Sequence, residues 1–377
     1  MKWKIPLFKI YWDNDDVKSV TGAIKKGMYW AVGPNIEKFE KRIAEYIGTR
    51  YAVVFNSGTS ALHAALLAYG IQRGDEVIVP SFTFIATANA PLFVGAKPVF
   101  ADIEERTFGL DPEDVKEKIT RKSRAIIPVH YGGCPCLIRE LKEIAEDHHL
   151  ILIEDAAESF GARIHDKKVG TFGDSAMLSF CQNKIITTGD GGVTVTNSKE
   201  TCEKMKLIRS HGRLETQDYF SSTEYIDYVT LGYNFRMPNI MAALGISQLR
   251  KVDKIIEMRR KNAKYMTEGL KQVKEIATPS TPKDCHHVYQ MYTIRVDANS
   301  RDDLMKYLAN NGIMTKVYFS PVHLTDFYGN ELKYEYKLPV TEEVSSRVVT
   351  LPMFPTLTME EMEYMIKKMK GFYEMMR

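Results

Sequence analysis

Apolar positions along the chain form short continuous runs that alternate with segments in which every third or fourth position is apolar. The runs Ala52–Phe55, Glu76–Val79 and His149–Ile153 predict buried strands, because each is short and followed by turn or polar residues. Further strands are expected at Lys97–Ala101, Ala125–His130, Ala176–Phe180 and Val193–Asn197. Helices are expected from a cap at Asn35 to Gly48, and over Ser60–Tyr69, Pro112–Ile119, Ser198–Ser210 and Asn239–Leu249. The alternation of strand and helix predicts an α/β fold with a largely parallel sheet.

The pattern changes from Val252 onward. A long charged amphipathic helix is expected over residues 253–274, strands over Val288–Val296 and Gly312–Phe319, and helices over Arg301–Asn310, Val340–Ser346 and Met359–Met375. Residues 214–230 are polar and aromatic without a clear period, which predicts a surface loop of the kind that shapes binding sites. The sequence therefore predicts a large α/β domain over residues 1–251 and a smaller α+β domain over residues 252–377.

Composition narrows the class of protein. The 377 residues are 44% hydrophobic and 26% charged, as in ordinary globular proteins. The 51 basic and 48 acidic residues give a net charge of +3, and no basic block suggests nucleic-acid binding. The N-terminal stretch lacks the apolar core of a signal peptide, and no apolar run approaches the roughly 20 residues of a membrane helix. We therefore expect a cytoplasmic protein with no nucleic-acid or membrane partner.

The cysteines and histidines do not predict a metal site. Five cysteines, an odd number scattered through a long chain, fit reduced thiols in the cytosol. Cys134 and Cys136 flank a proline without a second pair at zinc spacing, so ordinary loop cysteines are favoured over metal or redox roles. The pair His286 and His287 is better explained by a core or solvent-facing position than by metal binding.

A glycine turn between a strand and a helix suggests a phosphate site. In NSGTS (residues 56–60), free backbone N–H groups and the positive helix end would meet at one point, which suits phosphate. Gly58 permits close approach, and the hydroxyls of Thr59 and Ser60 add donors. An ordinary turn capped by Thr or Ser explains the motif equally well, and the motif lacks a P-loop lysine.

Two further strand ends carry candidate groups. Asp155 follows the apolar strand His149–Ile153, where ligands of open α/β sheets bind, and could pair with a protonated ring nitrogen. It could equally be a helix N-cap, since Ala156 and Ala157 follow it. Phe82 and Phe84 lie after the strand that ends near Pro80 and could stack on a flat ring, although a phenylalanine is more often part of the core.

The chain is organised around Lys184. It lies between the apolar strand Ala176–Phe180 and a turn that contains Gly189, Gly191 and Gly192. A lysine at the end of a buried strand loses hydration, which lowers its pKa and makes the neutral amine a nucleophile towards carbonyls. A solvated surface lysine is the simpler interpretation of the residue alone. Our hypothesis is that Lys184 forms a Schiff base with pyridoxal 5'-phosphate (PLP), with Asp155 against the pyridine nitrogen.

Taken together, these segments resemble the DegT/DnrJ/EryC1/StrS family of sugar aminotransferases. The resemblance spans nearly the whole chain and is carried by FEKRIAEYIGTRYAVVFNSGTSALHAAL, GDEVIVPSFTFIATANA, GAKPVFADI, IIPVHYGG, EDAAESFGA, FGDSAMLSF, the NK and TGDGG that follow it, RSHGR, GYNFRM and YFSPVHL. EDAAES and TGDGG resemble most the branch of perosamine synthases and related 4-amino-sugar enzymes. The resemblance implies the PLP-dependent transferase fold of type I and a homodimer with shared active sites.

The resemblance also implies roles for single residues. Lys184 would be the Schiff-base lysine and Asp155 the partner of the pyridine nitrogen. Gly58, Thr59 and Ser179 would hold the phosphate, which Asn234 would reach from the second subunit. Phe84, in preference to Phe82, would lie near the ring, and Glu158 near the ring hydroxyl. Arg213 and Arg236 are candidates for binding the diphosphate of the substrate.

The implied reaction moves an amino group from L-glutamate to a nucleotide-linked keto-sugar, with a 4-keto-6-deoxyhexose as the expected acceptor. Lys184 would act as general base and acid. Alternatives are a PLP-dependent sugar dehydratase or carbon–sulfur lyase on the same fold, and a regulator that binds PLP or a nucleotide sugar without turnover. The dehydratase branch replaces the lysine with histidine, and a pure sensor needs neither Lys184 nor Asp155, so the sequence favours transamination.

Overall fold

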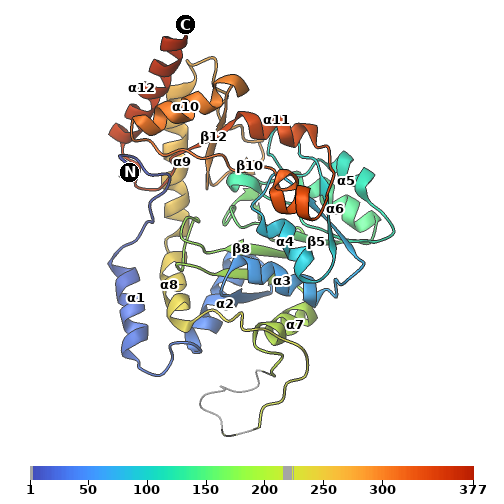
Figure 1. Cartoon of the computed structure of the whole chain (residues 1–377). Coiled ribbons are helices and arrows are strands. Elements are labelled where there is room, and N and C mark those ends of the chain that lie inside the picture. Colours follow the sequence, from blue (N-terminus) through green and yellow to red (C-terminus); the bar gives the residue numbers. More distant parts are fainter. Residues whose placement is uncertain (1–2, 215–222, 224) are drawn as a thin grey trace.

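The computed structural model describes residues 3–214, 223 and 225–377 (Figure 1). Most of the surface loop predicted over residues 214–230 lies outside the described residues. In Figure 1 the large sheet and its helices occupy the lower part of the molecule, and the C-terminal helices lie above them. The long helix α9 (Val252–Leu270) runs from one part to the other. The boundary predicted between residues 251 and 252 stays a prediction.

A seven-stranded sheet forms the centre of the N-terminal part of the chain. In spatial order its strands are β1 (Tyr51–Phe55), β9 (Gly192–Thr196), β8 (Ser175–Ser179), β5 (Ile151–Asp155), β4 (Ser123–Ile126), β2 (Glu76–Pro80) and β3 (Lys97–Ala101). The neighbours from β8 to β3 pair in parallel, whereas β9 is antiparallel to both β1 and β8. The predicted α/β fold with a largely parallel sheet is confirmed.

Helices cover both faces of this sheet. They are α2 (Pro34–Ile47), α3 (Gly58–Ala68), α4 (Ala86–Phe93), α5 (Pro112–Lys118), α6 (Ile138–Asp147), α7 (Lys199–Arg209) and α8 (Asn239–Leu249). The helix α1 (Asn14–Lys25) packs against α8 instead of the sheet. Side chains alternate along β1, so that Val54 joins a core with Phe39 of α2 while Val53 joins a core with Leu62 of α3. Because both faces are covered, the strands are continuously apolar, which is why they could be recognised from the sequence.

Much of the C-terminal part packs around a core of its own, whereas Val322, Tyr328 and Leu338 join a core of the large sheet. The C-terminal part contains α10 (Ala298–Asn310), α11 (Pro339–Arg347), α12 (Met359–Met376) and the antiparallel pair β11 (Tyr292–Arg295) and β12 (Val348–Leu351). Short elements complete the chain: the strands β6 (Arg163–Ile164), β7 (Lys167–Lys168) and β10 (Cys285–His286), 3-10 turns at Tyr131–Gly133 and Val322–Leu324, and a π turn at Phe327–Glu331. Met266 of α9, Leu304 of α10 and Met365 of α12 are fully buried in the core of the C-terminal part.

The strand predicted over Gly312–Phe319 is wrong. Ile313 makes an isolated bridge to Ile5, and Lys316 makes one to Thr350, so each end of the segment meets a different neighbour. The partner of β11 is instead β12, which the sequence pattern did not predict. Which segment pairs with β11 depends on contacts across the fold, because a strand is stabilised by neighbours that are distant in sequence.

Glu154 is a fully buried carboxylate on β5 that faces away from Asp155, its neighbour along the strand. One oxygen accepts the N–H groups of Phe172 and Gly173, both at 2.8 Å, and the other accepts that of Gly170 at 2.8 Å and lies 3.0 Å from His130 Nε2. Burial alone would raise the pKa of Glu154, but the contacts with His130 and the backbone N–H groups outweigh burial and leave this pKa below its usual value.

We expect Glu154→Gln to lower the free energy of unfolding by about 3 kcal/mol, because an amide NH₂ would face donors that now meet an oxygen. Urea unfolding measures the loss of free energy. Glu146→Gln, on the exposed face of α6, is the matched control, and we expect no measurable change in its free energy of unfolding. Since folding lowers the pKa of Glu154, its contribution is present above the unfolded value of about 4.3 and is lost as the pH falls through the folded value. An unchanged urea midpoint in Glu154→Gln would contradict a structural role.

Candidate active site

A cavity of about 580 Å³ opens at the carboxyl ends of the parallel strands. Its lining comes from segments far apart in sequence: residues 57–59 at the start of α3, 83–87 after β2, 155–158 after β5, 177–184 around the end of β8, and 316–320 from the C-terminal part. Most of the residues that the sequence singled out therefore face one space, which is of the size of small-molecule sites.

Asp155 is the buried acid of this cavity, with 5% of its surface exposed. Thr87 Oγ1 donates to its Oδ2 at 2.7 Å, and the N–H of Ala157 donates to its Oδ1 at 3.1 Å. Burial raises the pKa of Asp155 above its usual value, and these two hydrogen bonds and the nearby Lys184 only partly offset that effect. Residues 157–158 and 160–161 form turns, so the alternative that Asp155 caps a helix is wrong.

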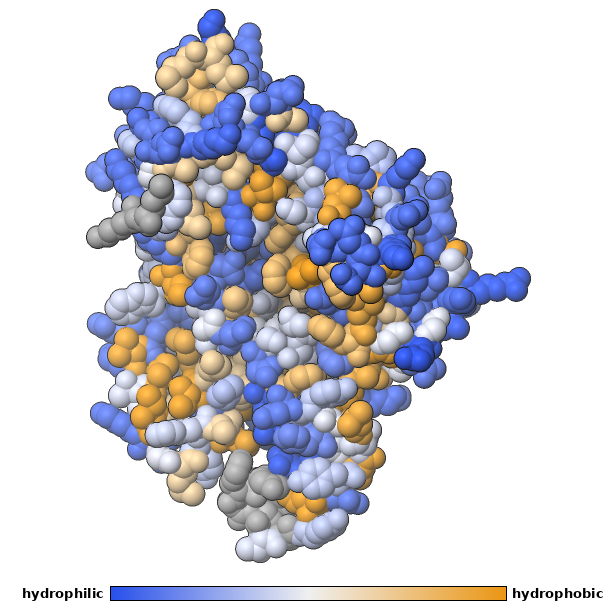
Figure 2. All heavy atoms as spheres, in the orientation of Figure 1, coloured by the Kyte–Doolittle hydropathy of each residue, from blue (hydrophilic) through white to orange (hydrophobic). Residues whose placement is uncertain are grey.

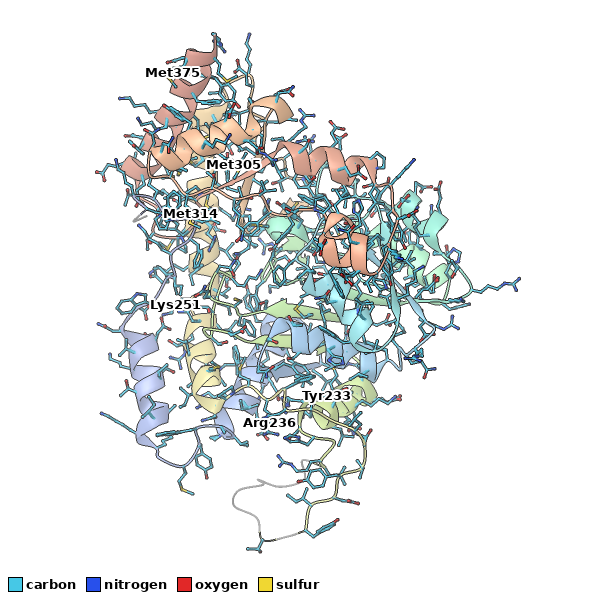
Figure 3. The ribbon with its side chains drawn as sticks, viewed as in Figure 1. Tyr233, Arg236, Lys251, Met305, Met314 and Met375 are labelled. Atoms are coloured by element: carbon cyan, nitrogen blue, oxygen red, sulfur yellow. The ribbon has the colours of Figure 1, made fainter. Side chains whose placement is uncertain are left out.

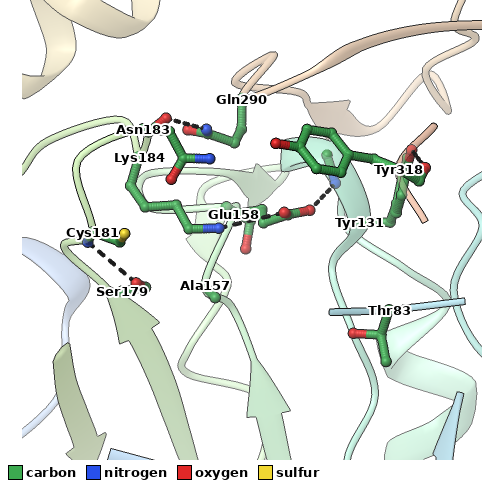
Figure 4. Close-up of polar contacts among 12 residues, drawn as sticks. Thr83, Tyr131, Ala157, Glu158, Ser179, Cys181, Asn183, Lys184, Gln290 and Tyr318 are labelled. Atoms are coloured by element: carbon green, nitrogen blue, oxygen red, sulfur yellow. Dashed lines mark hydrogen bonds and ion pairs between the residues drawn. The ribbon is translucent and has the colours of Figure 1, made fainter. Parts of the chain in front are cut away.

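Lys184 reaches the cavity from the loop between β8 and β9 (Figure 4). Its Nζ lies 3.4 Å from Oε1 of Glu158, and the other oxygen of Glu158 accepts the N–H of Gly132 at 2.9 Å. Both side chains are largely buried. The alternative of a solvated surface lysine is therefore wrong, and the amine is held in an ion pair.

The loop that carries Lys184 is fixed from two sides. The N–H of Lys184 donates to the carbonyl of Cys181 at 3.0 Å, and the side-chain amide of Gln290, from the segment before β11, donates to the carbonyl of Asn183. Residue 290 thus ties the loop to the C-terminal part of the chain. The lysine presents its amine from a backbone that has defined hydrogen bonds on both sides.

The start of α3 presents backbone N–H groups to the same cavity. The helix begins at Gly58, two residues earlier than predicted, and its cap is Ser57, whose Oγ accepts the N–H of Ser60 at 3.1 Å. Gly58 and Thr59 line the cavity together with Ser179 at the end of β8. The backbone of Gly192 lies so close that a Cβ there would sit 2.5 Å from the nitrogen of Gly58. The glycine turn predicted after Lys184 therefore brings the backbone of Gly192 close to the start of α3.

Phe82 and Phe84 differ in their burial and in whether they line the cavity. Phe82 is fully buried against Phe108 and Tyr131, in a small core beside the site. Phe84 lines the cavity and is 60% exposed, so it is the ring of the two that can meet a ligand.

Three predicted residues do not line the cavity of this chain. The guanidinium groups of Arg213 and Arg236 lie 3.1 and 3.3 Å from Ser210 Oγ at the end of α7, and Figure 3 shows Arg236 in the lower part of the molecule, near Tyr233. Asn234 is exposed, and its carbonyl accepts from the amide of Asn56 at 3.3 Å. The RSHGR segment ends α7, where the N–H of Gly212 donates to the carbonyl of Leu207 at 2.8 Å.

Sequence reasoning missed two groups of cavity residues. Thr87, which lies four residues after Thr83, donates to Asp155, and the 2.9 Å contact between the two hydroxyls shows a helical spacing that could have been noticed. Lys316 and Tyr318 belong to the segment that was mistaken for a strand. Within the described residues, no group of three or more His, Cys, Asp or Glu side chains could hold a metal ion, and no helix is long and apolar enough to cross a membrane.

Comparison with protein families matches residues 11–370 to the DegT/DnrJ/EryC1/StrS aminotransferase family. The chain belongs to this family. It is 37% identical over 370 residues to the GDP-perosamine synthase of Escherichia coli O157:H7, with 98% of each chain covered. It is 34% identical over 350 residues to the UDP-N-acetyl-3-dehydro-alpha-D-glucosamine 3-aminotransferase of Acidithiobacillus ferrooxidans, covering 92% of this chain and 91% of that one.

Among solved structures, the fold matches that of NtdA from Bacillus subtilis with its bound cofactor PMP, the amine form of PLP. The TM-score is 0.85 at 29% identity, over 95% of this chain and 82% of the other. The chain is therefore a member of a family of sugar aminotransferases, has the PLP-dependent transferase fold, and uses PLP as its cofactor.

The residues of the cavity fit this cofactor. PLP carries a phosphate, a pyridine nitrogen that is protonated when it acts, and an aldehyde that an amine can attack. The cavity offers the N-terminus of α3, the buried carboxylate of Asp155 and the amine of Lys184. In the described part of the protein, Asp155 is held by two neutral donors only, which suits the arrival of a cationic ring nitrogen.

Proposed function

We propose that the protein transfers an amino group from L-glutamate to a nucleotide-linked keto-sugar, with a 4-keto-6-deoxyhexose as the acceptor. The observation that carries the proposal is the placement of Lys184 and the buried Asp155 on one cavity with the start of α3. We choose the 4-keto position of the acceptor sugar because of the similarity to the relative named GDP-perosamine synthase. A sugar with a 3-keto group is the competing acceptor, because another relative is named as a 3-aminotransferase.

When bound, PLP withdraws electrons from the carbon that carries the amino group, which makes the proton on that carbon removable. In our proposal Lys184 moves this proton, and Asp155 keeps the ring nitrogen protonated through charge pairing. Glu158 holds the amine of Lys184 in place while the site is open, since the two groups are 3.4 Å apart.

The remaining residues position the cofactor. Gly58 and Thr59 would bind the phosphate through backbone N–H groups, and Ser179 through its hydroxyl. Phe84 would lie against the ring, where it also excludes water from one side of the reacting atoms.

We further propose a homodimer in which Asn234 of each chain completes the phosphate site of the other. Asn234 is exposed and outside the cavity lining of its own chain, which is what a residue that serves a partner requires. Figure 2 shows apolar side chains gathered over α1 and α8, where Val17 and Ile24 are 51% and 44% exposed. A patch of this kind supports burial against a second copy.

The function is tested by incubating the PLP-loaded protein with L-glutamate and a panel of 3-keto and 4-keto nucleotide sugars. We expect 2-oxoglutarate and one amino sugar in equal amounts, identified by mass spectrometry. Formation of a dehydrated or deoxy sugar instead would favour the dehydratase, and binding of a sugar without any 2-oxoglutarate would favour the regulator.

Gly192→Ala should weaken PLP binding by at least about tenfold, because the new side chain would displace the start of α3. A displacement of about 1 Å of a positioned group can lower a reaction rate by about 10²-fold, and we expect a comparable sensitivity of the affinity for PLP. The new Cβ would meet backbone atoms of Ser57 and Gly58 at 2.5 Å, and backbone cannot move aside as a flexible side chain can. Fluorescence titration with PLP measures the affinity. Gly22→Ala, where nothing lies within 4 Å, is the matched control and should bind PLP normally; equal affinities for the two variants would show that the start of α3 does not hold the phosphate.

A further inference from the structure

Lys316 is a cation that the described mechanism leaves unused. It lines the cavity from the segment between α10 and α11, and its side chain is exposed on the open side. Its backbone is fixed in both directions to β12: the N–H of Lys316 donates to the carbonyl of Thr350 at 3.2 Å, and the N–H of Thr350 donates back at 2.8 Å. The position of this lysine is therefore set by the sheet of the C-terminal part.

The ammonium group of Lys316 meets an aromatic face instead of an acid. Its Nζ lies 4.8 Å from the centroid of the Tyr318 ring, which also lines the cavity, and within the described residues it makes no ion pair. The buried lysines Lys184 and Lys251, by contrast, are paired with acids: Lys184 with Glu158 at 3.4 Å, and Lys251 with Asp13 at 2.6 Å. A cation held over a ring at the opening of a ligand site remains available to an anion.

The acids of the cavity do not compete for Lys316. Glu158 is occupied by Lys184 and the N–H of Gly132, and Asp155 is buried under Thr87. Asp190, the third acid of the lining, accepts the N–H of Gly191 at 2.8 Å. With the cofactor phosphate at the start of α3, the charge of Lys316 is left for a second anionic group.

We propose that Lys316 binds the anionic group of the substrate, an inference that rests on the proposed function. Both substrates of that reaction are anionic away from the reacting carbon: glutamate through its carboxylates, and the nucleotide sugar through its diphosphate. Because the two substrates occupy the same cavity in turn, one cation can serve either group. Lys316 would then contribute to the binding of these substrates without taking part in proton transfer.

The test uses the PLP-loaded protein and three unreactive probes: GDP, UDP and glutarate, the last a dicarboxylate without an amine. Calorimetric titration compares wild type with Lys316→Met, Lys316→Arg and Lys367→Met. Lys367 is an exposed lysine of α12 outside the cavity lining, so its variant is the matched control.

We expect Lys316→Met to bind at least one class of probe about tenfold more weakly, as for loss of one charged hydrogen bond. Lys316→Arg should bind within about threefold of wild type, because it keeps the charge with a different geometry. The salt dependence of binding should also fall in Lys316→Met. Weaker binding of the nucleotides alone assigns the diphosphate, weaker binding of glutarate alone assigns the carboxylate, and weaker binding of both assigns both.

Unchanged binding of all three probes in Lys316→Met overturns the inference, as does equal weakening in Lys367→Met. Steady-state kinetics separates this failure from failure of the proposed function. If wild type forms 2-oxoglutarate and amino sugar while Lys316→Met keeps the same KM values, only the role of Lys316 is wrong. If wild type forms neither product with any sugar, the proposed function is wrong.

Discussion

Lys184→Ala should lower the rate of amino transfer by at least about 10³-fold, since a positioned general acid–base group contributes about 10²–10⁴-fold. The amine of Lys184 pairs with Glu158 and acts on Asp155 across the cavity, and alanine has no group that could move the proton. Production of 2-oxoglutarate from L-glutamate measures the effect. Trapping the bound cofactor with borohydride, followed by mass spectrometry of the peptide around residue 184, gives a second readout that is independent of turnover.

Two further variants separate charge from chemistry. Lys184→Arg keeps a cation opposite Glu158 but cannot release a proton at neutral pH, so we expect a loss close to that of alanine. Lys199→Ala removes an exposed lysine of α7 that pairs with Glu203, and should keep the wild-type rate. A wild-type rate in Lys184→Ala, or labelling of another lysine, would refute the assignment.

Asp155→Asn should lower the rate by about 10²–10⁴-fold, the equivalent of the 3–5 kcal/mol lost when one partner of a buried charge pair is removed. Asparagine can keep the local contacts, because the hydroxyl of Thr87 can turn and accept where it now donates. What is lost is the negative charge that would hold the ring nitrogen of PLP protonated. Initial rates with saturating PLP measure this loss, and Asp174→Asn, beside the far end of β5, serves as a control for the sheet.

Without the cofactor, Asp155→Asn should leave the stability of the protein unchanged or increase it, although it lowers the rate. Folding raises the pKa of Asp155, so the native state binds more protons than the unfolded state between the two pKa values. Any stability linked to this group is therefore complete below the unfolded value of about 3.9 and is lost as the pH rises through the folded value. At pH 7 the ionised carboxylate disfavours folding, so cofactor-free Asp155→Asn should melt at or above the wild-type temperature.

Addition of PLP should reverse the order of the two melting temperatures, because a cationic ring nitrogen stabilises the charged carboxylate. A cofactor-free Asp155→Asn protein that melts well below wild type would show that Asp155 has a structural role in place of a cofactor-binding one. Thr87→Val, which removes the donor to Oδ2, should raise the cost of the buried charge and lower the melting temperature of the cofactor-free protein.

Local patterns predicted most of the elements. The helix Asn239–Leu249 and the strand Lys97–Ala101 have the predicted bounds, and most other elements begin or end within a few residues of prediction. They were predictable because strands buried on both faces are continuous apolar runs and helices carry a repeat of 3.6 residues. The position of Asp155 near the end of such a run also placed it at the ligand-binding edge of the sheet.

Only the tertiary structure decided which residues meet. The partner of β11 is β12 and not the strand expected over Gly312–Phe319. Residues Lys316 and Tyr318 of that segment line the cavity instead. Arg213 and Arg236, chosen for their charge, lie against Ser210 outside the lining, and Thr87 was overlooked although it donates to Asp155.

The sequence by itself determined the α/β class, the buried strands and the residues with the right chemistry at strand ends, because these follow from short-range periodicity. The tertiary structure alone decided the ion pair of Lys184 with Glu158, the approach of Gly192 to Gly58 and the place of Lys316. The first two contacts join residues 26 and 134 positions apart (184 − 158 and 192 − 58). Such partners are set by packing and strand pairing across the fold, which no local pattern encodes.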